Sequence, residues 1–406
     1  MDIKIVASTK ENYQGTKEEF DSLAGHGAGV CYLADTMETL INEPKEKTER
    51  RVGLIKSSRH LSPFDHSFIT LQIRDIPKIV AMALNNEQFY VTNEKSARYT
   101  KMVLTPEEQA YYDKWLDIFQ AEMRERCQPE DPKWYNDKRI LKLAQENARY
   151  LTSVFTPTTM WYTLSYRQFN ILYTLIKDET VRLSGKEDAF SQRLAKGFGD
   201  FAEMLAGLKD PNGVSYLDEG LTNNAKHRRL SLLLDKPFKR DFGDFYSLSY
   251  KGSFAEYAQT ERQRPISYGI TMLENPEFYI PPILKAKPEL VQRWQRDCFA
   301  LKSNFPQGML VMISEGGRFE RFLEKVDDRN CSQAQLEIDH QTADTLRQMY
   351  VAYSAKGDVE KVELLKPHLK GSRCLAGYPC SSPCGFKKGI LGVNNSGLPG
   401  KEGRII

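Results

Sequence analysis

Three side chains that could bind a phosphorylated ligand are spaced two residues apart in the stretch Asn93-Glu94-Lys95-Ser96-Ala97-Arg98-Tyr99. In an extended segment this spacing places Glu94, Ser96 and Arg98 on one face. A carboxylate accepts hydrogen bonds from sugar or ring groups, a hydroxyl can donate to phosphate, and a guanidinium can grip phosphate with two parallel bonds. The stretch therefore predicts a site for a nucleoside monophosphate. A solvated turn with one ion pair is the plainer alternative.

The size and composition of the chain indicate an ordinary globular protein. A length of 406 residues is too great for one typical core, so two domains or a duplicated unit are expected. A net charge of +3 is too small to indicate nucleic acid or an anionic membrane as a partner. The chain has no apolar run of about 18 residues that would span a membrane, and Met1–Val6 lacks the apolar core of a signal peptide. We expect a cytoplasmic location.

The seven cysteines fit a reducing compartment better than a disulfide framework. Three of them, Cys374, Cys380 and Cys384, are clustered, and could hold zinc only with an outside ligand such as His368. Their spacing is not the paired C-x-x-C form, so we expect free thiols and no metal site.

The order of expected elements occurs twice along the chain. The patterns predict helices over 15–58, 76–90, 106–126, 141–152 and 168–177, strands over 67–73 and 245–250, and a later helix up to about 355. Lys209–Gly213 is a strong turn signal and the expected linker. We predict an α+β protein of two similar units, 1–190 (the first copy) and 200–355 (the second copy), followed by a Cys/Gly/Pro-rich tail, 356–406. Each copy would hold a mixed or antiparallel sheet packed with long helices, and the two would form a pseudo-dimer.

Both copies carry fragments of one long motif. The first copy has His60-x-Ser62 with Asp65 and His66, then Glu94-x-Ser96-x-Arg98-Tyr99, then Ala148-Arg149. The second has Gln259-x-x-Arg262-Gln263-Arg264-x-x-Ser267 and, later, Arg329-(x)5-Gln335-x-Glu337-Ile338. Together they resemble the flavin-dependent thymidylate synthase family, whose motif reads R-H-R-x-x-S-x-x-E-x-S-x-R-Y and is followed by an A-R helix and a late R-(x)5-Q-x-E-I segment.

Each copy has lost the part of the motif that the other retains. Counted back from Glu94, the R-H-R positions fall on Asn86-Glu87-Gln88 and the serine position falls on Val91. In the second copy the counterpart of E-x-S-x-R-Y would begin at Ile270 and is absent. In this family the active site lies between subunits, so a fused pair can keep one complete composite site while the other decays. A homodimer of this chain would then be equivalent to the family's tetramer.

The resemblance implies methylation of dUMP at C5, with methylenetetrahydrofolate as carbon donor, NADPH as reductant and FAD as the bound flavin. Arg329 would be the catalytic cation that makes the uracil electron-rich. The residues implied in nucleotide binding are Glu94, Lys95, Ser96, Ala97, Arg98, Arg149, Gln259 and Arg262. Those implied in FAD binding are His60, Ser62, Glu94, Arg262, Gln263 and Arg264.

Three alternatives stay open from the sequence. Gln263 replaces the histidine of the motif and loses a titratable ring, so the chain could be a non-catalytic nucleotide-binding or structural homologue. The same chemistry could act on UMP. Arg329 could also be an ordinary ion-pair partner of Glu337 or Asp339.

Overall fold

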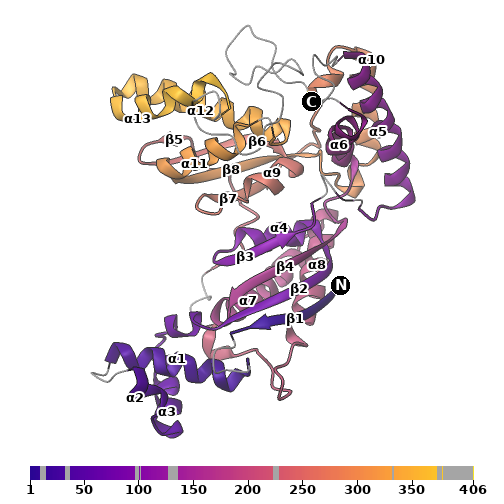
Figure 1. Cartoon of the computed structure of the whole chain (residues 1–406). Coiled ribbons are helices and arrows are strands. Elements are labelled where there is room, and N and C mark those ends of the chain that lie inside the picture. The colour runs from indigo at the N-terminus through magenta and orange to yellow at the C-terminus, as the bar shows by residue number, and fades with distance from the viewer. Residues whose placement is uncertain are drawn as a thin grey trace. The chain divides into compact units, whose positions relative to one another are not determined.

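The computed structural model describes residues 1–9, 15–32, 37–96, 100, 102–126, 136–222, 228–331, 333–372, 377 and 406. The chain forms two compact units, each built from two separate segments (Figure 1). Unit 1 comprises Met1–Lys95 and Pro157–Ser231, and unit 2 comprises Ser96–Thr156 and Leu232–Ile406. No helix within the described ranges is both long and apolar enough to cross a membrane. Both units mix helices with an antiparallel sheet, so the predicted α+β class is confirmed.

Unit 1 contains one sheet with the spatial order β1-β2-β4-β3. Its strands are β1 (Asp2–Ser8), β2 (Phe68–Pro77), β3 (Tyr90–Glu94) and β4 (Pro157–Ser165). Its helices are α1 (Lys17–Tyr32), α2 (Met37–Ile41), α3 (Lys45–Ser57), α4 (Lys78–Asn86), α7 (Tyr166–Ser184) and α8 (Ala189–Ala206), with the 3₁₀ turns η1 (Ser62–Asp65) and η3 (Glu219–Leu221).

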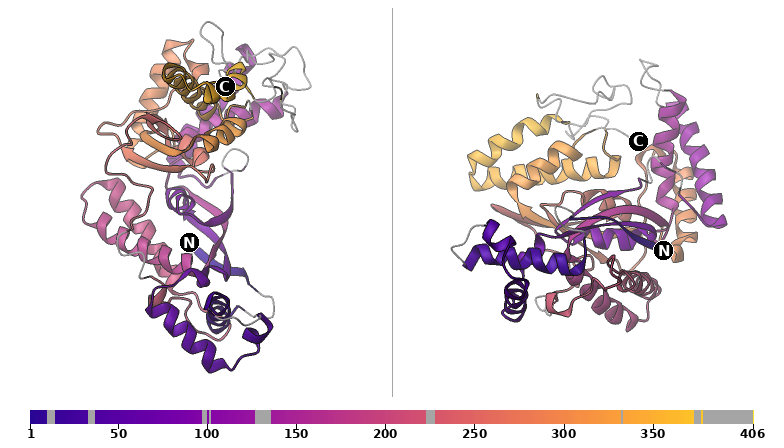
Figure 2. Two further views of the ribbon diagram at one scale, coloured as in Figure 1. Left: turned by 90° about the vertical axis from the view of Figure 1, so that its left-hand side faces the viewer. Right: turned by 60° about the horizontal axis from the view of Figure 1, so that its bottom comes forward.

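Alternation of apolar and polar residues along β2 decides which face of this sheet is buried. Ile69, Leu71 and Ile73 are almost fully buried, and the helices α4, α7 and α8 pack on the sheet. Figure 2 (left) shows α7 and α8 side by side. A Cβ at Gly197 of α8 would lie 3.0 Å from a methyl group of Val80 in α4, so the glycine permits the close approach of these two helices.

Unit 2 contains a second antiparallel sheet, with the order β5-β6-β8-β7. Its strands are β5 (Asp241–Phe242), β6 (Phe245–Ser253), β7 (Ser267–Met272) and β8 (Leu310–Arg318). The helices α9 (Phe254–Thr260), α11 (Phe319–Arg329) and α12 (Leu336–Lys356) pack on this sheet, and α13 (Val359–Leu365) packs on α12 (Figure 1). The remaining elements are α5 (Pro106–Arg126), α6 (Asp137–Ala148) and α10 (Pro288–Ala300), with the 3₁₀ turns η2 (Arg149–Leu151), η5 (Pro282–Leu284), η6 (Lys302–Asn304) and η7 (Lys366–Lys370).

An aromatic core joins α5 to α10 within unit 2. The Trp115 and Trp294 rings meet edge to face with centroids 4.8 Å apart, and Phe119 lies 5.5 Å from Trp294. All three side chains are fully buried, and such rings contribute most of the apolar area in a core of this kind. A helix of the segment predicted as the first copy, 1–190, is therefore packed against a helix of the segment predicted as the second copy, 200–355.

The two sheets share their register as well as their strand order. Val91 pairs with Thr163, and Ser267 pairs with Gly316. Thr163 and Gly316 each lie two residues before the N-cap of the following helix, α7 or α11. Val91 and Ser267 therefore occupy equivalent positions, as the count along the motif indicates.

The same register places Glu94 opposite Met160, and Ile270 opposite Ile313. Met160 lies five residues before the N-cap of α7, and Ile313 lies five residues before the N-cap of α11. The correspondence of Glu94 with Ile270 is thus the one inferred from the sequence.

The two compact units differ in their boundaries from the two predicted copies, 1–190 and 200–355. Residues 96–156, with α5 and α6, belong to unit 2, because these helices bury their apolar faces in the core that α10 shares.

Unit 1 continues to Ser231, so Lys209–Gly213 is a turn inside unit 1 and is not the linker that we expected. Asp210 closes this turn by accepting hydrogen bonds from the backbone N–H groups of Asn212 and Val214, both at 2.8 Å. The helix α13 falls within the predicted tail, 356–406, and most of the rest of that tail lies outside the described residues.

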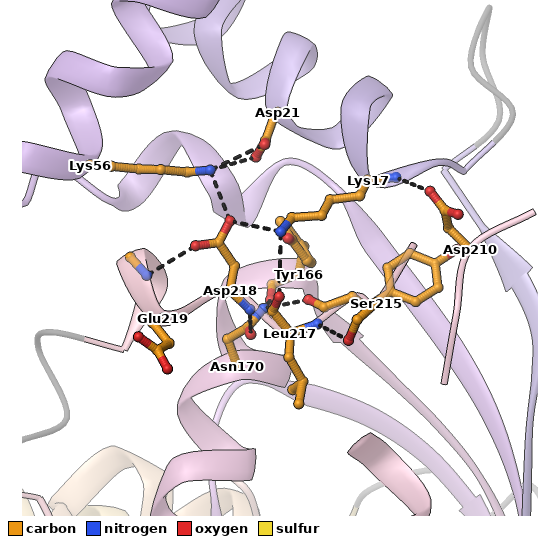
Figure 3. A network of polar contacts seen from close by, with 12 residues as sticks. Lys17, Asp21, Lys56, Tyr166, Asn170, Asp210, Ser215, Leu217, Asp218 and Glu219 are labelled. Carbon is orange, nitrogen blue, oxygen red and sulfur yellow. Dashed lines mark hydrogen bonds and ion pairs between the residues drawn. The ribbon is translucent and has the colours of Figure 1, made fainter. Parts of the chain in front are cut away.

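Lys56 of α3 connects three elements of unit 1 (Figure 3). Its Nζ lies 3.1 Å from Asp21 of α1 and 2.9 Å from Asp218, which precedes η3. Burial acts to raise the pKa of Asp218, but the hydrogen bond and charge of Lys56 outweigh it and hold that pKa below its ordinary value. The ammonium also lies 5.2 Å from the centroid of the Phe64 ring in η1. Lys56 therefore helps to fix η1, which carries the predicted flavin contact Ser62.

Replacing Lys56 with methionine would leave Asp21 and Asp218 as adjacent carboxylates without this cation. We expect Lys56→Met to lower the free energy of unfolding by about 2–3 kcal/mol, at the low end for a broken buried pair because Lys56 is partly exposed. Lys196→Met, which removes the exposed pair with Asp200, is the matched control and should cost less than about 0.5 kcal/mol. Urea denaturation measures both, and equal losses would contradict the role given to Lys56.

Candidate functional site

The side-chain amide of Gln335 joins two residues predicted to contact the nucleotide. Its Oε1 accepts hydrogen bonds from Nη2 of Arg149 and Nε2 of Gln259, and its Nε2 donates to the Tyr150 hydroxyl. Tyr150 donates in turn to Oε2 of Glu337, at 2.8 Å. All five side chains are buried and belong to unit 2. We call these five residues the Gln335 cluster; it combines two residues of the first copy with three of the second.

The ends of three helices place the members of this cluster. Arg149 and Tyr150 are the first two residues of η2, which directly follows α6. Gln259 is the penultimate residue of α9, and Gln335 is the N-cap residue of α12. The Gly308 N–H donates to the Tyr150 carbonyl at 2.7 Å. A Cβ at Gly308 would lie 2.9 Å from the Cβ of Tyr150, so this close backbone approach requires glycine.

Two buried carboxyl groups meet beside the cluster. Glu337 accepts hydrogen bonds from the N–H and the hydroxyl of Ser253, at 2.8 and 2.6 Å, in addition to the one from Tyr150. Glu256 shares a hydrogen bond with Glu337. Burial raises the pKa of both carboxyls, but the hydrogen bonds from Ser253 and Tyr150 oppose this effect only at Glu337. We therefore place the shared proton on Glu256 and the negative charge on Glu337.

A buried ion pair lies next to these carboxyls. Lys325 Nζ is 2.5 Å from Oε2 of Glu315, and neither side chain is exposed. The hydroxyls of Tyr246 and Tyr250 donate to the same carboxylate at 3.3 and 3.2 Å. These hydrogen bonds satisfy charges that would otherwise be costly in the interior.

The predicted R-Q-R stretch follows α9. Gln263 is buried and its Nε2 donates to Oδ2 of Asp328, at 3.1 Å, while Arg262 and Arg264 are half-buried. Asp328 directly precedes Arg329, the last residue of α11. Burial raises the pKa of Tyr268 well above its ordinary value, and Arg329 is close enough for its charge to oppose that shift. Gln263 thus reaches the neighbourhood of the predicted catalytic arginine.

A cavity of about 430 Å³ opens in unit 1 at the start of α7. We call it the unit 1 pocket; it is lined by Asp65, Phe68, Gln88, Phe89, Ser165, Arg167, Gln168, Ile171 and Arg228. Arg167 Nη1 and the Ser165 hydroxyl donate to the two oxygens of Asp65 at 2.8 and 2.6 Å. Arg167 Nε and Gln168 Nε2 are buried donors for which the described part of the chain supplies no acceptor. Phe89 is 84% exposed. The donors of Arg167 and Gln168 could bind the oxygens of a ligand, and the exposed Phe89 ring could stack on a planar ring system of the same ligand.

Glu94, from the motif that first indicated a nucleotide, lies at the end of β3 in unit 1. Its carboxylate is buried, is 2.6 Å from Lys78 Nζ and accepts a hydrogen bond from Asn85 at 3.2 Å. The plainer alternative of an ion pair therefore describes Glu94 in part, although its carboxylate is buried and does not lie in a solvated turn.

The other predicted residues near this stretch are placed as follows. Ser62 and Lys95 are exposed, His60 and Ser96 are half-buried, and Ala97 and Arg98 lie outside the described residues.

The structure places the side chains of two cysteines. Cys298 is buried and is a free thiol, and Cys331 is half-buried. Cys374, Cys380 and Cys384 lie outside the described residues. Among the residues that the structure does describe, no group of three or more His, Cys, Asp or Glu side chains could hold a metal ion.

Sequence reasoning missed some members of both sites. Gln335 and Glu337 stand in the late motif segment but received no binding role, and Tyr150 follows Arg149 without any motif signal. Arg167 stands among apolar residues in the sequence, and a charge in such a neighbourhood needs a partner; in the structure that partner is Asp65.

A family model described as thymidylate synthase complementing protein matches residues 15–180. The predicted resemblance is confirmed. The matched segment includes Glu94 and Arg149 and ends before Gln259. At the level of this family, the prediction of a thymidylate synthase-like methyltransferase is confirmed as well.

Solved structures of two kinds resemble this chain. One is a UMP/dUMP methylase PolB from Streptomyces cacaoi bound with 5-Br dUMP, with 17% identity and a TM-score of 0.28, covering 43% of this chain and 76% of that one. Another is thymidylate synthase X from Helicobacter pylori with FAD and dUMP, with 18% identity and a TM-score of 0.30, covering 55% of this chain and 99% of that one. Among proteins with curated descriptions, none matches.

The proton on Glu256 gives a prediction about pH. Because burial raises the pKa of Glu256 in the folded state, unfolding above about pH 4.3 releases a proton. Wild-type stability should therefore decrease as the pH rises, by up to about 1.4 kcal/mol per pH unit. The glutamine side chain in Glu256→Gln is neutral at every pH, so this variant lacks the decrease in stability with pH. Its free energy of unfolding relative to wild type should therefore rise from pH 5 to pH 8.

Urea denaturation at several pH values measures this difference. Exposed Glu363, changed to glutamine, is the control and should leave the wild-type pH dependence in place. Parallel curves for Glu256→Gln and wild type would show that Glu256 is not the protonated partner.

Proposed function

We propose that the chain methylates dUMP at C5 in an FAD-dependent reaction, with methylenetetrahydrofolate and NADPH as co-substrates, at one composite site per chain. The observation that carries the proposal is the Gln335 cluster, in which Arg149 of the first copy and Gln259 of the second share one amide oxygen. These residues come from the two complementary halves of the motif. The match to the thymidylate synthase complementing family supports the same chemistry.

Gln259 has an atom available for a uracil ring. Its Oε1 is buried and receives no hydrogen bond from any described residue, while its Nε2 is held by Gln335. A buried acceptor without a donor is costly, and a ring N–H such as N3–H of uracil would satisfy it. Arg149 would hold the phosphate together with Arg98 and Ser96. The roles given above to the other motif residues, with Arg329 as the cation that favours charge on the uracil, stay part of this proposal.

The unit 1 pocket has the properties that a flavin nucleotide needs. Arg167 Nε and Gln168 Nε2 would donate to its phosphate or carbonyl oxygens, and Phe89 offers an exposed face for a planar ring. Ser62 lies at the start of η1, and Asp65, which lines the pocket, lies at its end. FAD, when bound, supplies the redox chemistry of the reaction, and the protein supplies binding and orientation.

Two features support an origin by tandem duplication. The sheets have the same strand order, and their register equates Val91 with Ser267 and Glu94 with Ile270. Each copy lacks the half of the motif that the other retains. If the fused chain stands for a pair of subunits, a homodimer would correspond to the family's tetramer.

The decisive experiment combines FAD uptake with turnover. Purified protein is incubated with FAD, freed of excess flavin, and assayed with NADPH, methylenetetrahydrofolate and either dUMP or UMP. We expect a yellow protein that methylates dUMP, detected as a mass gain of the nucleotide. A colourless protein that takes up no FAD would overturn the enzyme proposal in favour of a non-catalytic homologue. Methylation of UMP alone would replace the proposed substrate.

Arg167 should matter for flavin binding if the unit 1 pocket holds FAD. We expect Arg167→Ala to weaken FAD binding about 10- to 100-fold, the loss of one charge-assisted hydrogen bond. Arg182, on the same helix and paired with Glu179, is the control, and Arg182→Ala should leave the FAD affinity unchanged. Equal affinities of wild type and Arg167→Ala, measured by flavin fluorescence titration, would place FAD elsewhere.

A further inference from the structure

We propose that Tyr150 and Glu337 are positioning residues: they fix the orientation of the Gln335 amide and thereby hold Arg149 and Gln259 in place for a nucleotide. The proposal rests on the proposed function in that the ligand of Arg149 and Gln259 is taken to be a uridine monophosphate. The geometry of the relay itself does not depend on the identity of the ligand.

The direction of each hydrogen bond in this relay follows from the one before it. An ionised Glu337 can only accept hydrogen bonds, so the Tyr150 hydroxyl must donate its single proton to Glu337, at 2.8 Å. The Tyr150 oxygen can then only accept, and the neighbouring group of Gln335 must be its NH₂. The carbonyl oxygen of Gln335 is thereby turned toward Arg149 and Gln259.

The opposite orientation of Gln335 would break the cluster. The two ends of a glutamine amide are nearly equal in size, so packing alone scarcely distinguishes them. A flipped Gln335 would point its NH₂ at two other donors, the Arg149 guanidinium and the Gln259 amide. Tyr150 and Glu337 supply the chemical preference that prevents this flip.

The surroundings of Glu337 keep it in the accepting form. Ser253 gives it two hydrogen bonds, at 2.8 and 2.6 Å, and the charge of Arg149 favours its ionised state. Glu256 is the titratable group in contact with it, and burial raises the pKa of Glu256 well above its ordinary value, so we assign the shared proton to Glu256. Lys325 and Glu315 also act electrostatically on Glu256 from α11 and β8.

Four residues of the relay occur in two close pairs along the chain. Arg149 is followed directly by Tyr150, and Gln335 is followed two residues later by Glu337. Each copy thus contributes one residue that orients the amide of the cluster. The composite site then depends on both copies even in its supporting hydrogen bonds.

Tyr150→Phe tests the relay, because it keeps the ring that packs 4.8 Å from Tyr279 and removes only the hydroxyl. We expect dUMP affinity, measured by calorimetry, to fall about tenfold, with FAD affinity unchanged. In turnover the KM for dUMP should rise more than kcat falls. Glu337→Gln should have a similar effect, and the double variant should lose no more than either single one, because both act through one relay. Tyr246→Phe is the matched control, since Tyr246 also donates to a buried glutamate of unit 2, and should keep the wild-type affinity.

A second measurement needs no nucleotide. In protein labelled with ¹⁵N-arginine, the guanidinium protons of Arg149 should exchange with solvent faster in Tyr150→Phe than in wild type or Tyr246→Phe. Unchanged exchange in Tyr150→Phe would overturn the relay. Faster exchange in a protein that binds no dUMP would support the relay while refuting the proposed substrate. Faster exchange with unchanged dUMP affinity would overturn the inference that the relay serves nucleotide binding.

Discussion

An amide side chain has one acceptor oxygen, and the arrangement of unit 2 depends on the hydrogen bonds that this oxygen of Gln335 accepts. That oxygen accepts from Arg149 and Gln259 at once, so two helix ends that are distant in the sequence must converge on one point. The N-cap position of Gln335 fixes the start of α12 at the same place. A buried guanidinium and a buried amide are tolerated in an interior only where such hydrogen bonds are made.

The packing of apolar helices brings these groups together. α5 and α6 follow β3 in the sequence but belong to unit 2. There α5 buries Trp115 and Phe119 against Trp294 of α10. Lys114 and the Trp115 indole both donate to Asp297 of α10, at 2.5 and 2.7 Å, which fixes how α5 meets α10. Because α6 leads directly into Arg149, the packing of these helices in unit 2 places Arg149 beside Gln259 and Gln335.

Local patterns in the sequence predicted many of the helices but few of the strands. The alternation around Ile69, Leu71 and Ile73 predicted β2. Motif counting paired Val91 with Ser267, and these two residues hold the same position in the register of their sheets. The motif also indicated that Arg149 and Gln259 belong to one site.

The missed features all depend on long-range contacts. Nothing in the local sequence shows that Gln335 bridges these two residues, because an amide in a loop has no periodicity to mark it. The boundary of unit 1 at Ser231 is set by which surfaces the helices bury, and a turn signal at Lys209–Gly213 cannot reveal that. The partner of Glu94 is Lys78, which lies 16 residues earlier at the start of α4, and no motif indicates this pair.

The central claim is that residues of both copies form a single nucleotide site in each chain. Isothermal titration of FAD-loaded protein with dUMP measures this most directly through the binding stoichiometry. The account predicts one dUMP bound per chain. Two equivalent sites per chain would show that both copies had kept a working site, and would contradict the assembly of one composite site from complementary halves.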